Sequence, residues 1–471
     1  MKKLLIAAAA IPGLAFATPP IMPPGPPPSP PPLSEMAPGL RDAALSDDLA
    51  WNLIEGLTTE VGPRLAGTEA EARARQWAVA RLRELGFANV RVEDFPMQVW
   101  VRGAETAEIV APFPQKLAVT ALGRSGATPE AGLAAEVVGF RDLAALAAAP
   151  DAAVRGRIVY VGHAMMPTQD GSGYGHFGPV RFAGPGIAAR KGAAAIVIRS
   201  AGTDRDRRNP HTGMTSWPEG VAAIPAGALS NPDADQLERI LARGQPVRMR
   251  LALTPRWIGE RMSGNVVAEV PGTDPSAGVV LIGGHLDSWD LSPGALDNAA
   301  GVGITVAAAK RIMDAGRPRR TIRVVLFGAE EVGVIGGAAY FERHRGAGDV
   351  VFVSESDFGA DRIWRMDASF DDAARPIADR VAALLGPLGV TRGTAPAGAG
   401  ADLGAWARDG VAAISLRQDG LRYFDFHHTP EDTLDKVDPA QLRQNVAAWT
   451  AMLAVVADAP EPIGRVERPR P

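Results

Sequence analysis

Between residues 42 and 101, the spacing of hydrophobic and polar positions predicts helix, turn, helix and strand. Residues 69–85 place apolar side chains at the intervals of a helix with one buried face, and Gly86 suits its end. Residues 89–101 alternate between apolar and polar, which is typical of a half-buried strand. The first ordered part of the chain is therefore expected to mix both kinds of element.

The pattern changes between residues 103 and 255, where short apolar runs stand among glycine- and proline-rich loops. Strands are predicted at 157–161 and 193–199, and Asn231 followed by proline predicts the start of a helix that runs towards residue 242. The GYGHFG segment at 173–178 fits a dinucleotide fingerprint by spelling, but it lacks the strand-turn-helix context and is predicted to be a loop. A smaller domain inserted at 103–255 is the expected arrangement.

From residue 265 to 457, strand and helix patterns alternate regularly. This alternation predicts an α/β fold with a mostly parallel or mixed sheet flanked by helices. The four strands expected at its centre are 279–283, 322–327, 350–354 and 411–416. Together with 41–102, residues 256–460 are expected to form the main domain, followed by a tail at 461–471.

The start of the chain is typical of an exported protein. Lys2 and Lys3 precede an apolar run that ends in the small-residue stretch AFA, so residues 1–17 are predicted to be a cleaved signal peptide. The run is shorter than the ~20 residues of a membrane-spanning helix. Residues 18–40 are rich in proline and predict an extended linker. We expect a periplasmic or secreted protein without stable membrane insertion after cleavage.

The composition restricts the class of protein, its possible partners and the side chains that could hold a metal. Hydrophobic residues make up 46% of the chain and charged residues 22%, as in folded globular proteins. The net charge of -4 leaves no basic excess for a nucleic-acid partner. Cysteine is absent, so any metal must be held by imidazole and carboxylate groups. No Walker loop, G-x-S-x-G elbow or H-E-x-x-H motif is found, which disfavours P-loop, serine-hydrolase and thermolysin-like chemistry.

Acidic and histidine residues follow each of the four central strands. In open α/β sheets, loops at the carboxyl ends of strands surround the ligand site, so these residues are expected to meet. The candidates, in chain order, are His285, Asp287, Glu330, Glu331, Asp357, His427 and His428. Such donors suit zinc, and a pair of zinc ions needs one ligand that reaches both. Asp297, after the Ser-Pro-Gly turn and before a helix expected from residue 298, is the candidate bridge.

The expected cage pairs His285 with Asp357 on one metal and Glu331 with His428 on the other, with Asp297 between them. Asp287 would accept the free ring N–H of His285 and fix its orientation. Glu330 remains free to act as general base on the attacking water. His428 is preferred over His427 as the ligand, with His427 packing or hydrogen-bonding nearby. The other four histidines are interpreted as structural or surface residues.

The segments GGHLDSWD, FGAEEVG, SESDFG and FHHTPEDT, with Asp297 after the first, resemble the zinc peptidase family M28. The resemblance implies the fold of zinc aminopeptidases (phosphorylase/hydrolase-like), a protease-associated type of inserted domain, and hydrolysis of dipeptides or short peptides from a free terminus with two zinc ions per chain. It assigns metal ligation to His285, Asp297, Glu331, Asp357 and His428, and supports Glu330 as base.

Two other functions remain open at this point. One is a single-zinc acyltransferase of the glutaminyl cyclase kind, and the other is a non-catalytic binding protein on a peptidase fold. The presence of all five ligands and the base favours the hydrolase. The sequence does not decide between attack at the amino or the carboxyl end, or between the two candidate roles of the inserted domain, capping the cleft or forming a homodimer.

Overall fold

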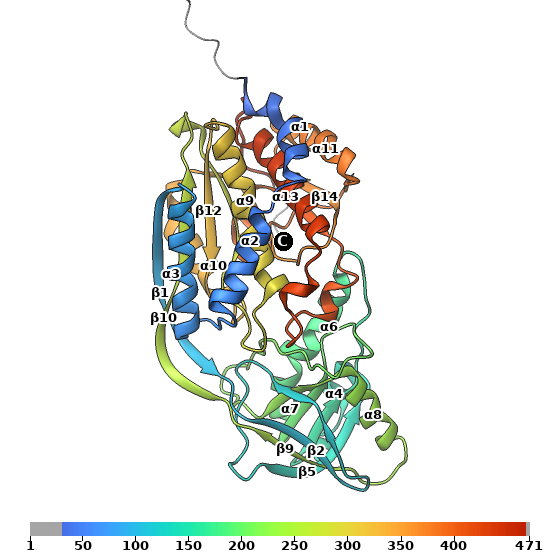
Figure 1. Cartoon of the computed structure of the whole chain (residues 1–471). Helices are drawn as coiled ribbons and strands as arrows, with labels where there is room; N and C mark the ends of the chain where they lie inside the picture. Colours follow the sequence, from blue (N-terminus) through green and yellow to red (C-terminus); the bar gives the residue numbers. More distant parts are fainter. Residues whose placement is uncertain (1–30, 468–471) are drawn as a thin grey trace, which may run out of the picture.

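Two eight-stranded sheets organise residues 31–467, which the computed structural model describes (Figure 1). The predicted signal peptide and the linker up to residue 30 lie outside the described residues. The strands of the first sheet, in spatial order, are β1 (Ala88–Val101), β10 (Arg256–Val270), β12 (Thr321–Phe327), β11 (Val279–His285), β13 (Val350–Glu355), β16 (Ala412–Gln418), β14 (Ile363–Ser369) and β15 (Thr391–Arg392).

The first sheet is mixed, as predicted. Strands β12, β11, β13 and β16 run parallel at its centre, whereas β10 is antiparallel to β12, and β14 is antiparallel to β16. All seven residues of β11 are buried, because helices cover both faces of the central strands. The four strands predicted for this region are confirmed to within a few residues.

Alternation along β11 assigns each helix to a face of the sheet. Val280 and Ile282 pack in a core that includes the long helices, while Val279 and Leu281 pack on the other side with Tyr340. The helices on the first side are α1 (Leu33–Ala44), α2 (Leu49–Gly56), α3 (Glu69–Glu84), α9 (Ala300–Ala315), α11 (Arg375–Leu385) and α13 (Pro439–Val456); those on the second are α10 (Ile335–His344) and α12 (Gly404–Arg408).

The second sheet is built entirely from the chain between β1 and β10. Its strands, in spatial order, are β3 (Gln115–Leu117), β2 (Glu105–Ala111), β9 (Arg248–Leu253), β5 (Leu133–Phe140), β6 (Ile158–Val161), β7 (Ala195–Arg199), β8 (Ala226–Leu229) and β4 (Val119–Ala121). Its helices are α4 (Leu143–Ala148), α5 (Asp151–Val154), α6 (Ser172–Phe182), α7 (Gly184–Arg190) and α8 (Asn231–Leu241). We call residues 103–255 the insertion; its likeness to a protease-associated domain stays a prediction.

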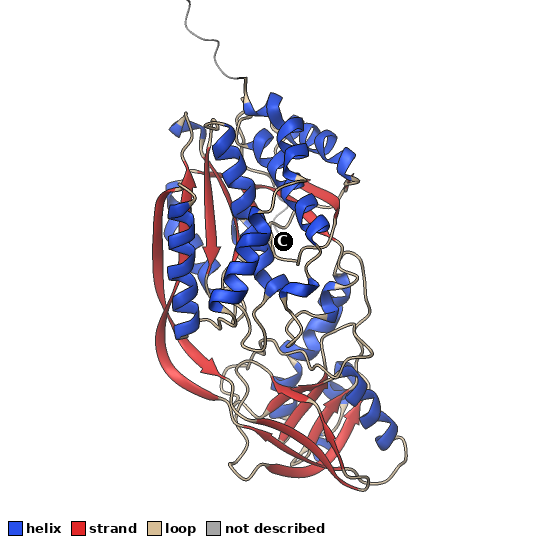
Figure 2. Ribbon diagram, in the orientation of Figure 1, coloured by secondary structure: helices blue, strands red, loops and turns tan. Residues whose placement is uncertain are grey.

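Figure 2 shows the two sheets as separate groups of strands, with α6 near their junction. The long strands β1 and β10 pair along most of their length and lead into and out of the insertion. Within residues 31–467, no helix combines the length and apolar character needed to cross a bilayer.

Three local predictions were wrong, for physical reasons. Residues 173–178 belong to helix α6, because burial of Phe177 and Val180 outweighs the low helix propensity of glycine. The cap of α8 is Ser230, one residue earlier than predicted, with its hydroxyl accepting from the Asp233 amide at 3.2 Å. Packed structure also begins earlier, because α1 covers residues assigned to the linker and contacts α13.

The predicted tail is also attached where it is described. Arg380 forms two hydrogen bonds with the Glu461 carboxylate, of 2.7 and 2.8 Å, and the Val466 amide donates to the Gly410 carbonyl at 2.7 Å. Residues 461–467 therefore belong to the packed main domain.

Helix α13 should contribute strongly to stability, because Trp449 within it is fully buried. Replacing Trp449 with Ala removes a large side chain from a dense core and should lower the free energy of unfolding by about 3–5 kcal/mol, measured by urea denaturation. The matched control is Trp257→Ala, because Trp257 is 50% exposed and should tolerate the change. Equal losses in the two variants would contradict this account of the core.

Candidate metal centre

The carboxyl ends of the central parallel strands bring the predicted residues into one buried cluster. β11 ends at His285, β12 leads into Glu330 and Glu331, and β13 leads into Asp357. The loop after β16 supplies two adjacent histidines, while Asp297 lies in the segment η3 (Ala295–Ala299) before α9, where its own backbone angles are not helical (φ -124°, ψ 87°). The parallel direction of the strands explains the convergence, since all four ends lie on one edge of the sheet.

The Asp297 carboxylate lies between two histidine–carboxylate pairs. Its Oδ1 atom is 3.1 Å from Nε2 of His285, and its Oδ2 atom is 3.2 Å from Nε2 of His428. The His285 nitrogen is also 3.2 Å from Oδ1 of Asp357, and the His428 nitrogen is 3.0 Å from Oε2 of Glu331. The structure thus brings together all five predicted ligands, in the predicted pairing.

These residues fit the binding of metal ions. Imidazole nitrogens and carboxylate oxygens are zinc donors, and one ligand atom from each of His285, Asp297 and Glu331 lies within 4.8 Å of the others. The buried Oε1 atom of Glu331 has no hydrogen-bond partner among the described residues. Nor does any lysine or arginine in the described range form an ion pair with the three carboxylates of the cage. The negative charge of these three carboxylates is therefore suited to neutralisation by a bound metal cation.

The electrostatics of the cluster lead to the same interpretation. Burial, together with the charge of the adjacent Asp297, raises the pKa of Glu331 to about 7. Burial also raises the pKa of Glu330 well above its usual value, and Asp357 adds to this. Burial alone would lower the pKa of His285, but Asp357 and the neighbouring aspartates raise it well above normal. Mutual repulsion among these acids favours either protons or a metal cation in their midst.

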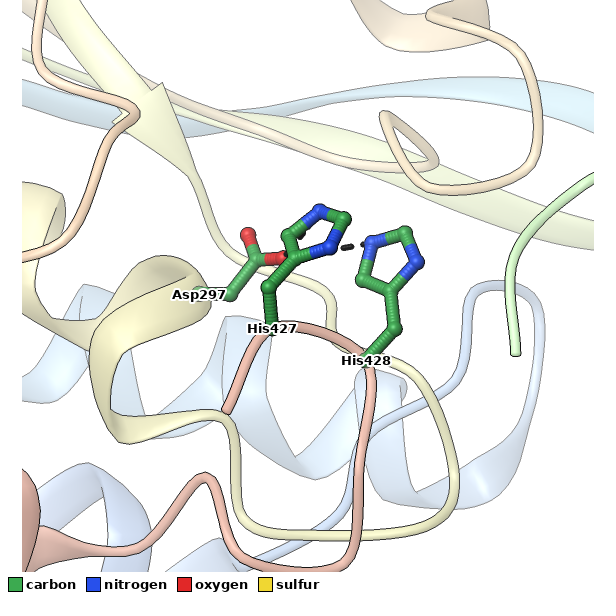
Figure 3. A group of neighbouring side chains, drawn as sticks. All are labelled: Asp297, His427 and His428. Atoms are coloured by element: carbon green, nitrogen blue, oxygen red, sulfur yellow. Dashed lines mark ion pairs between the residues drawn. The ribbon is translucent and has the colours of Figure 1, made fainter. Parts of the chain in front are cut away.

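The second histidine, His427, lies beside the cluster but makes fewer contacts with it. Its ring stacks on His428 with centroids 3.5 Å apart, and its Nε2 is 3.5 Å from Oδ2 of Asp297 (Figure 3). Its Nδ1 atom has no hydrogen-bond partner among the described residues. Because His428 contacts the carboxylates of both Asp297 and Glu331, whereas the only carboxylate that His427 contacts in the described range is that of Asp297, His428 remains the better candidate ligand.

Asp287 connects two of the strand ends. Its two carboxylate oxygens accept the backbone N–H groups of Glu330 at 3.1 Å and Glu331 at 3.3 Å. The Nδ1 atom of His285 lies 3.0 Å from the main-chain carbonyl of Asp287 and 3.5 Å from its carboxylate. The main-chain carbonyl is therefore the closer acceptor for the ring N–H, rather than the carboxylate that was expected in this role, whose oxygens accept the backbone N–H groups of the turn after β12.

Asp297 is held through its own backbone. The Asp432 carboxylate accepts the N–H of Leu296 at 2.6 Å and the N–H of Asp297 at 3.0 Å. The loop before Asp297 is held by the fully buried Arg64, which donates to main-chain carbonyls at both of its ends, including those of Leu286 and Gly294. Neither Asp432 nor Arg64 was expected at the site, although Asp432 lies within the FHHTPEDT segment.

The orientation of His428 depends on the insertion. Its Nδ1 atom lies 3.2 Å from the main-chain carbonyl of Thr212, and its own carbonyl accepts the Thr212 N–H at 3.0 Å. In the neutral ring, an N–H donated to that carbonyl leaves Nε2 unprotonated and facing Asp297 and Glu331. The insertion thus selects the tautomer of His428 that a metal requires.

His211 fixes the same loop from within the insertion. One ring nitrogen lies 2.7 Å from the His427 carbonyl and the other 2.6 Å from Oδ1 of Asp204. Both the His211 and the Asp204 side chains are fully buried. The neighbouring Thr203 adds a backbone hydrogen bond to the Phe424 carbonyl at 3.1 Å. No spacing or motif in the sequence indicated this network.

The chain matches peptidase family M28 over residues 265–453. Carboxypeptidase Q of Bos taurus is 35% identical over 412 residues, which cover 87% of this chain and 85% of the relative, and that of Mus musculus is 36% identical over 411 residues. The chain belongs to peptidase family M28. It is accordingly a metallopeptidase that acts on peptides.

Solved structures agree with this assignment. A peptidase M28 precursor from Shewanella amazonensis SB2B has a TM-score of 0.90 and 45% identity, covering 93% of this chain and 99% of that one. A zinc aminopeptidase from Bacillus subtilis shares the fold, with a TM-score of 0.63, 19% identity and coverage of 88% and 95%. The predicted fold class is thus confirmed as that of M28 peptidases.

A cavity of about 320 Å³ opens onto the cluster in this M28 chain. Glu330 lines it, as do residues from the helix α6 of the insertion. The full lining consists of Tyr174, Arg181, Phe182, Met214, Asp297, Glu330, Glu331, Gly333, Val334, Asp357, Phe358, Ala401, Tyr423, Phe424, His427 and His428. Since ligand pockets span about 300–1,000 Å³, this cavity suits a small ligand. The insertion therefore forms part of the wall of the candidate active site.

Loss of the His211 side chain should weaken metal binding without removing a ligand. His211→Ala frees the loop that carries His428, so zinc affinity should fall by about 10–100-fold, as for other residues that orient metal ligands. The measurement is zinc affinity by competition with a chromogenic chelator. The control is His344→Ala on α10, a histidine that bonds to Glu93 outside the cluster. Unchanged affinity in His211→Ala would contradict the orienting role.

Proposed function

We propose that this M28 peptidase is a two-zinc exopeptidase of dipeptides and short peptides. His285 and Asp357 would hold one ion, Glu331 and His428 the other, and Asp297 both. The observation that carries the proposal is the Asp297 carboxylate, because its two oxygens lie 3.1 and 3.2 Å from two different histidines. A carboxylate shared in this way suits two ions about 3.5–4 Å apart.

The proposed chemistry is hydrolysis of a peptide bond by an attacking water. Bound zinc ions supply Lewis acidity, which polarises the scissile carbonyl and makes a nearby water more acidic. Glu330 lines the cavity beside the cluster, and none of the described hydrogen bonds engages its carboxylate. Its Oε atoms are free to accept the proton of the attacking water and to deliver it to the leaving amine.

The shape of the site supports attack at a chain end. The cavity is small, and α6 of the insertion covers one side of it, so a long polypeptide has little room to pass through. Carboxypeptidase Q and an aminopeptidase of Bacillus subtilis, both named for cleavage at a chain end, are relatives of this chain. Export to the periplasm or the medium rests on residues 1–17 and is part of the proposal, as is formation of a homodimer.

The proposed base is tested by Glu330→Gln. The amide cannot accept the proton, so kcat should fall by about 10²–10⁴-fold on dipeptide substrates. Zinc content, measured by inductively coupled plasma mass spectrometry, should stay at two ions per chain, because Glu330 is not one of the five ligands. Glu342→Gln, an exposed change on α10, serves as the matched control.

Three outcomes would argue against the proposal. Full turnover in Glu330→Gln would remove the assigned base. One zinc per chain without dipeptide hydrolysis would favour an acyltransferase of the glutaminyl cyclase kind. Two zinc ions without turnover over a broad panel of dipeptides would favour a binding protein on a peptidase fold.

A further inference from the structure

A second, smaller pocket adjoins the cavity at the candidate metal centre. It has a volume of about 100 Å³, and its lining shares Asp357 and Phe358 with the lining of that cavity. The other polar side chains of this side pocket come from Asp170 in the insertion, from Glu355 at the end of β13 and from β16. Since a water molecule occupies about 30 Å³, the side pocket has room for about three waters or for the end of a flexible side chain.

Glu355 lines the side pocket and lacks a partner for its charge. The residue is 7% exposed, and its Oε2 atom accepts the backbone N–H of Leu403 at 3.1 Å. Its buried Oε1 atom has no hydrogen-bond partner within residues 31–467, and no lysine, arginine or histidine there forms an ion pair with the carboxylate. A buried acid without a counter-charge is costly, so a cation is the partner that this environment lacks.

The loop after β15 holds the Glu355 carboxylate in place. The Ser415 hydroxyl accepts the N–H groups of Gly398 at 3.2 Å and Ala399 at 3.4 Å, which fixes the loop against β16. The next residue, Gly400, has a φ of +92°, and a Cβ atom there would be 2.2 Å from Oε2 of Glu355. Only glycine leaves room for the carboxylate at this point. Glu355 is thus a preorganised acceptor.

A second buried acid, Asp402, lies close to Glu355. It directly precedes Leu403 in the chain, and its Oδ1 atom accepts the Gly337 N–H at 3.0 Å. Its Oδ2 atom is buried and has no partner in the described part of the chain. Burial raises the pKa of Asp402 well above its usual value, and the charge of Glu355 adds to this. Two neighbouring acids, each with one unsatisfied oxygen, strengthen the attraction of this region for a cation.

The remaining charged groups of the side pocket do not oppose a cation. Asp170 is exposed, and only one of its oxygens is engaged, by the Ser172 N–H at 3.0 Å. Arg417 is the only lysine or arginine in the lining, and its Nε atom donates to the buried Asp367 on β14 at 3.1 Å. The arginine is therefore turned to an acid of its own, and Glu355 and Asp170 remain available to a ligand.

We propose that the side pocket binds the cationic end of a substrate side chain, with Glu355 as its partner inside and Asp170 at the rim. This inference rests on the proposed exopeptidase function and specifies its substrates as dipeptides or short peptides that contain lysine or a shorter diamino acid. Lysine suits the pocket, because its ammonium is a compact charge on a flexible stem. The α-ammonium of a substrate is only one carbon from the scissile carbonyl and so stays at the metal cluster, whereas the side pocket lies past Asp357 and Phe358.

The experiment compares lysine with norleucine, which has the same carbon chain without the ammonium. Lysyl-alanine, norleucyl-alanine, alanyl-lysine and alanyl-norleucine are hydrolysed by wild type, Glu355→Gln, Asp170→Asn and the control Glu130→Gln, an exposed change in the insertion. Wild type and control should prefer lysine by about 10–100-fold in kcat/KM at one of the two positions, the factor expected of a hydrogen bond to a charged group.

The two pocket variants should reduce this preference to different extents. Glu355→Gln keeps the shape of the side chain but removes its charge, so the ratio of lysine to norleucine should approach one. Asp170→Asn, at the exposed rim, should lower the ratio by only about 2–5-fold, because solvent screens the charge there. A merely structural loss in either variant would reduce kcat/KM for lysine and norleucine equally and leave the ratio unchanged.

A second measurement separates this inference from the proposed function. Isothermal titration calorimetry on zinc-loaded protein measures binding of the reduced-amide analogues of the four dipeptides, which are not hydrolysed. The lysine form should bind wild type about 10–100-fold more tightly than the norleucine form, and Glu355→Gln should bind both equally.

Each contrary result has one meaning. Equal hydrolysis of lysine and norleucine dipeptides by wild type would overturn the assignment of the side pocket and leave the exopeptidase intact. A lysine preference that persists in Glu355→Gln would also overturn it. If Glu355→Gln does not fold, Asp170→Asn and calorimetry on wild type still decide. Absence of hydrolysis of all four dipeptides by zinc-loaded wild type would overturn the proposed function, and calorimetry would then show whether the side pocket takes a cation.

Discussion

The position of the Asp297 carboxylate between His285 and His428 is the constraint on which the rest of the site depends. Burying several acids side by side is unfavourable unless their charge is compensated, so the fold must hold them against their own repulsion. Asp432 does so through the backbone of Asp297, and Arg64 through the loop that leads to it. The parallel strands supply the remaining groups at one edge of the sheet, which gives the cluster a rigid base.

The sequence predicted the parts of this arrangement that depend on local pattern. Short apolar runs followed by acids or histidines indicated the central strands and the residues at their ends, and the order of strands along the chain was enough to expect convergence. Asp297 was recognisable because a turn and a helix start surround it. The faces of the sheet also follow from alternation, as Val280 and Leu281 show.

The parts that sequence analysis missed depend on contacts between distant segments. The carbonyl of Thr212 and the ring of His428 are 216 residues apart, and a main-chain carbonyl leaves no trace in residue identity. Helix α6 was predicted as a loop because its glycines suggested flexibility, whereas burial of Phe177 decides its conformation. Because this helix was not predicted, nothing in the sequence placed its residue Arg181 near the acids at the ends of the central strands.

The hydrogen bond between Thr212 and His428 also bears on how such enzymes can be rearranged. The insertion is joined to the rest of the chain through one pair of strands, β1 and β10, which is the topology of a module that recombination can exchange. Its exchange would preserve every predicted metal ligand in the sequence and still alter the candidate metal centre, because the ring of His428 lies against a main-chain carbonyl of the insertion. The insertion and the rest of the chain are separable in topology, yet both are needed to build the candidate metal centre.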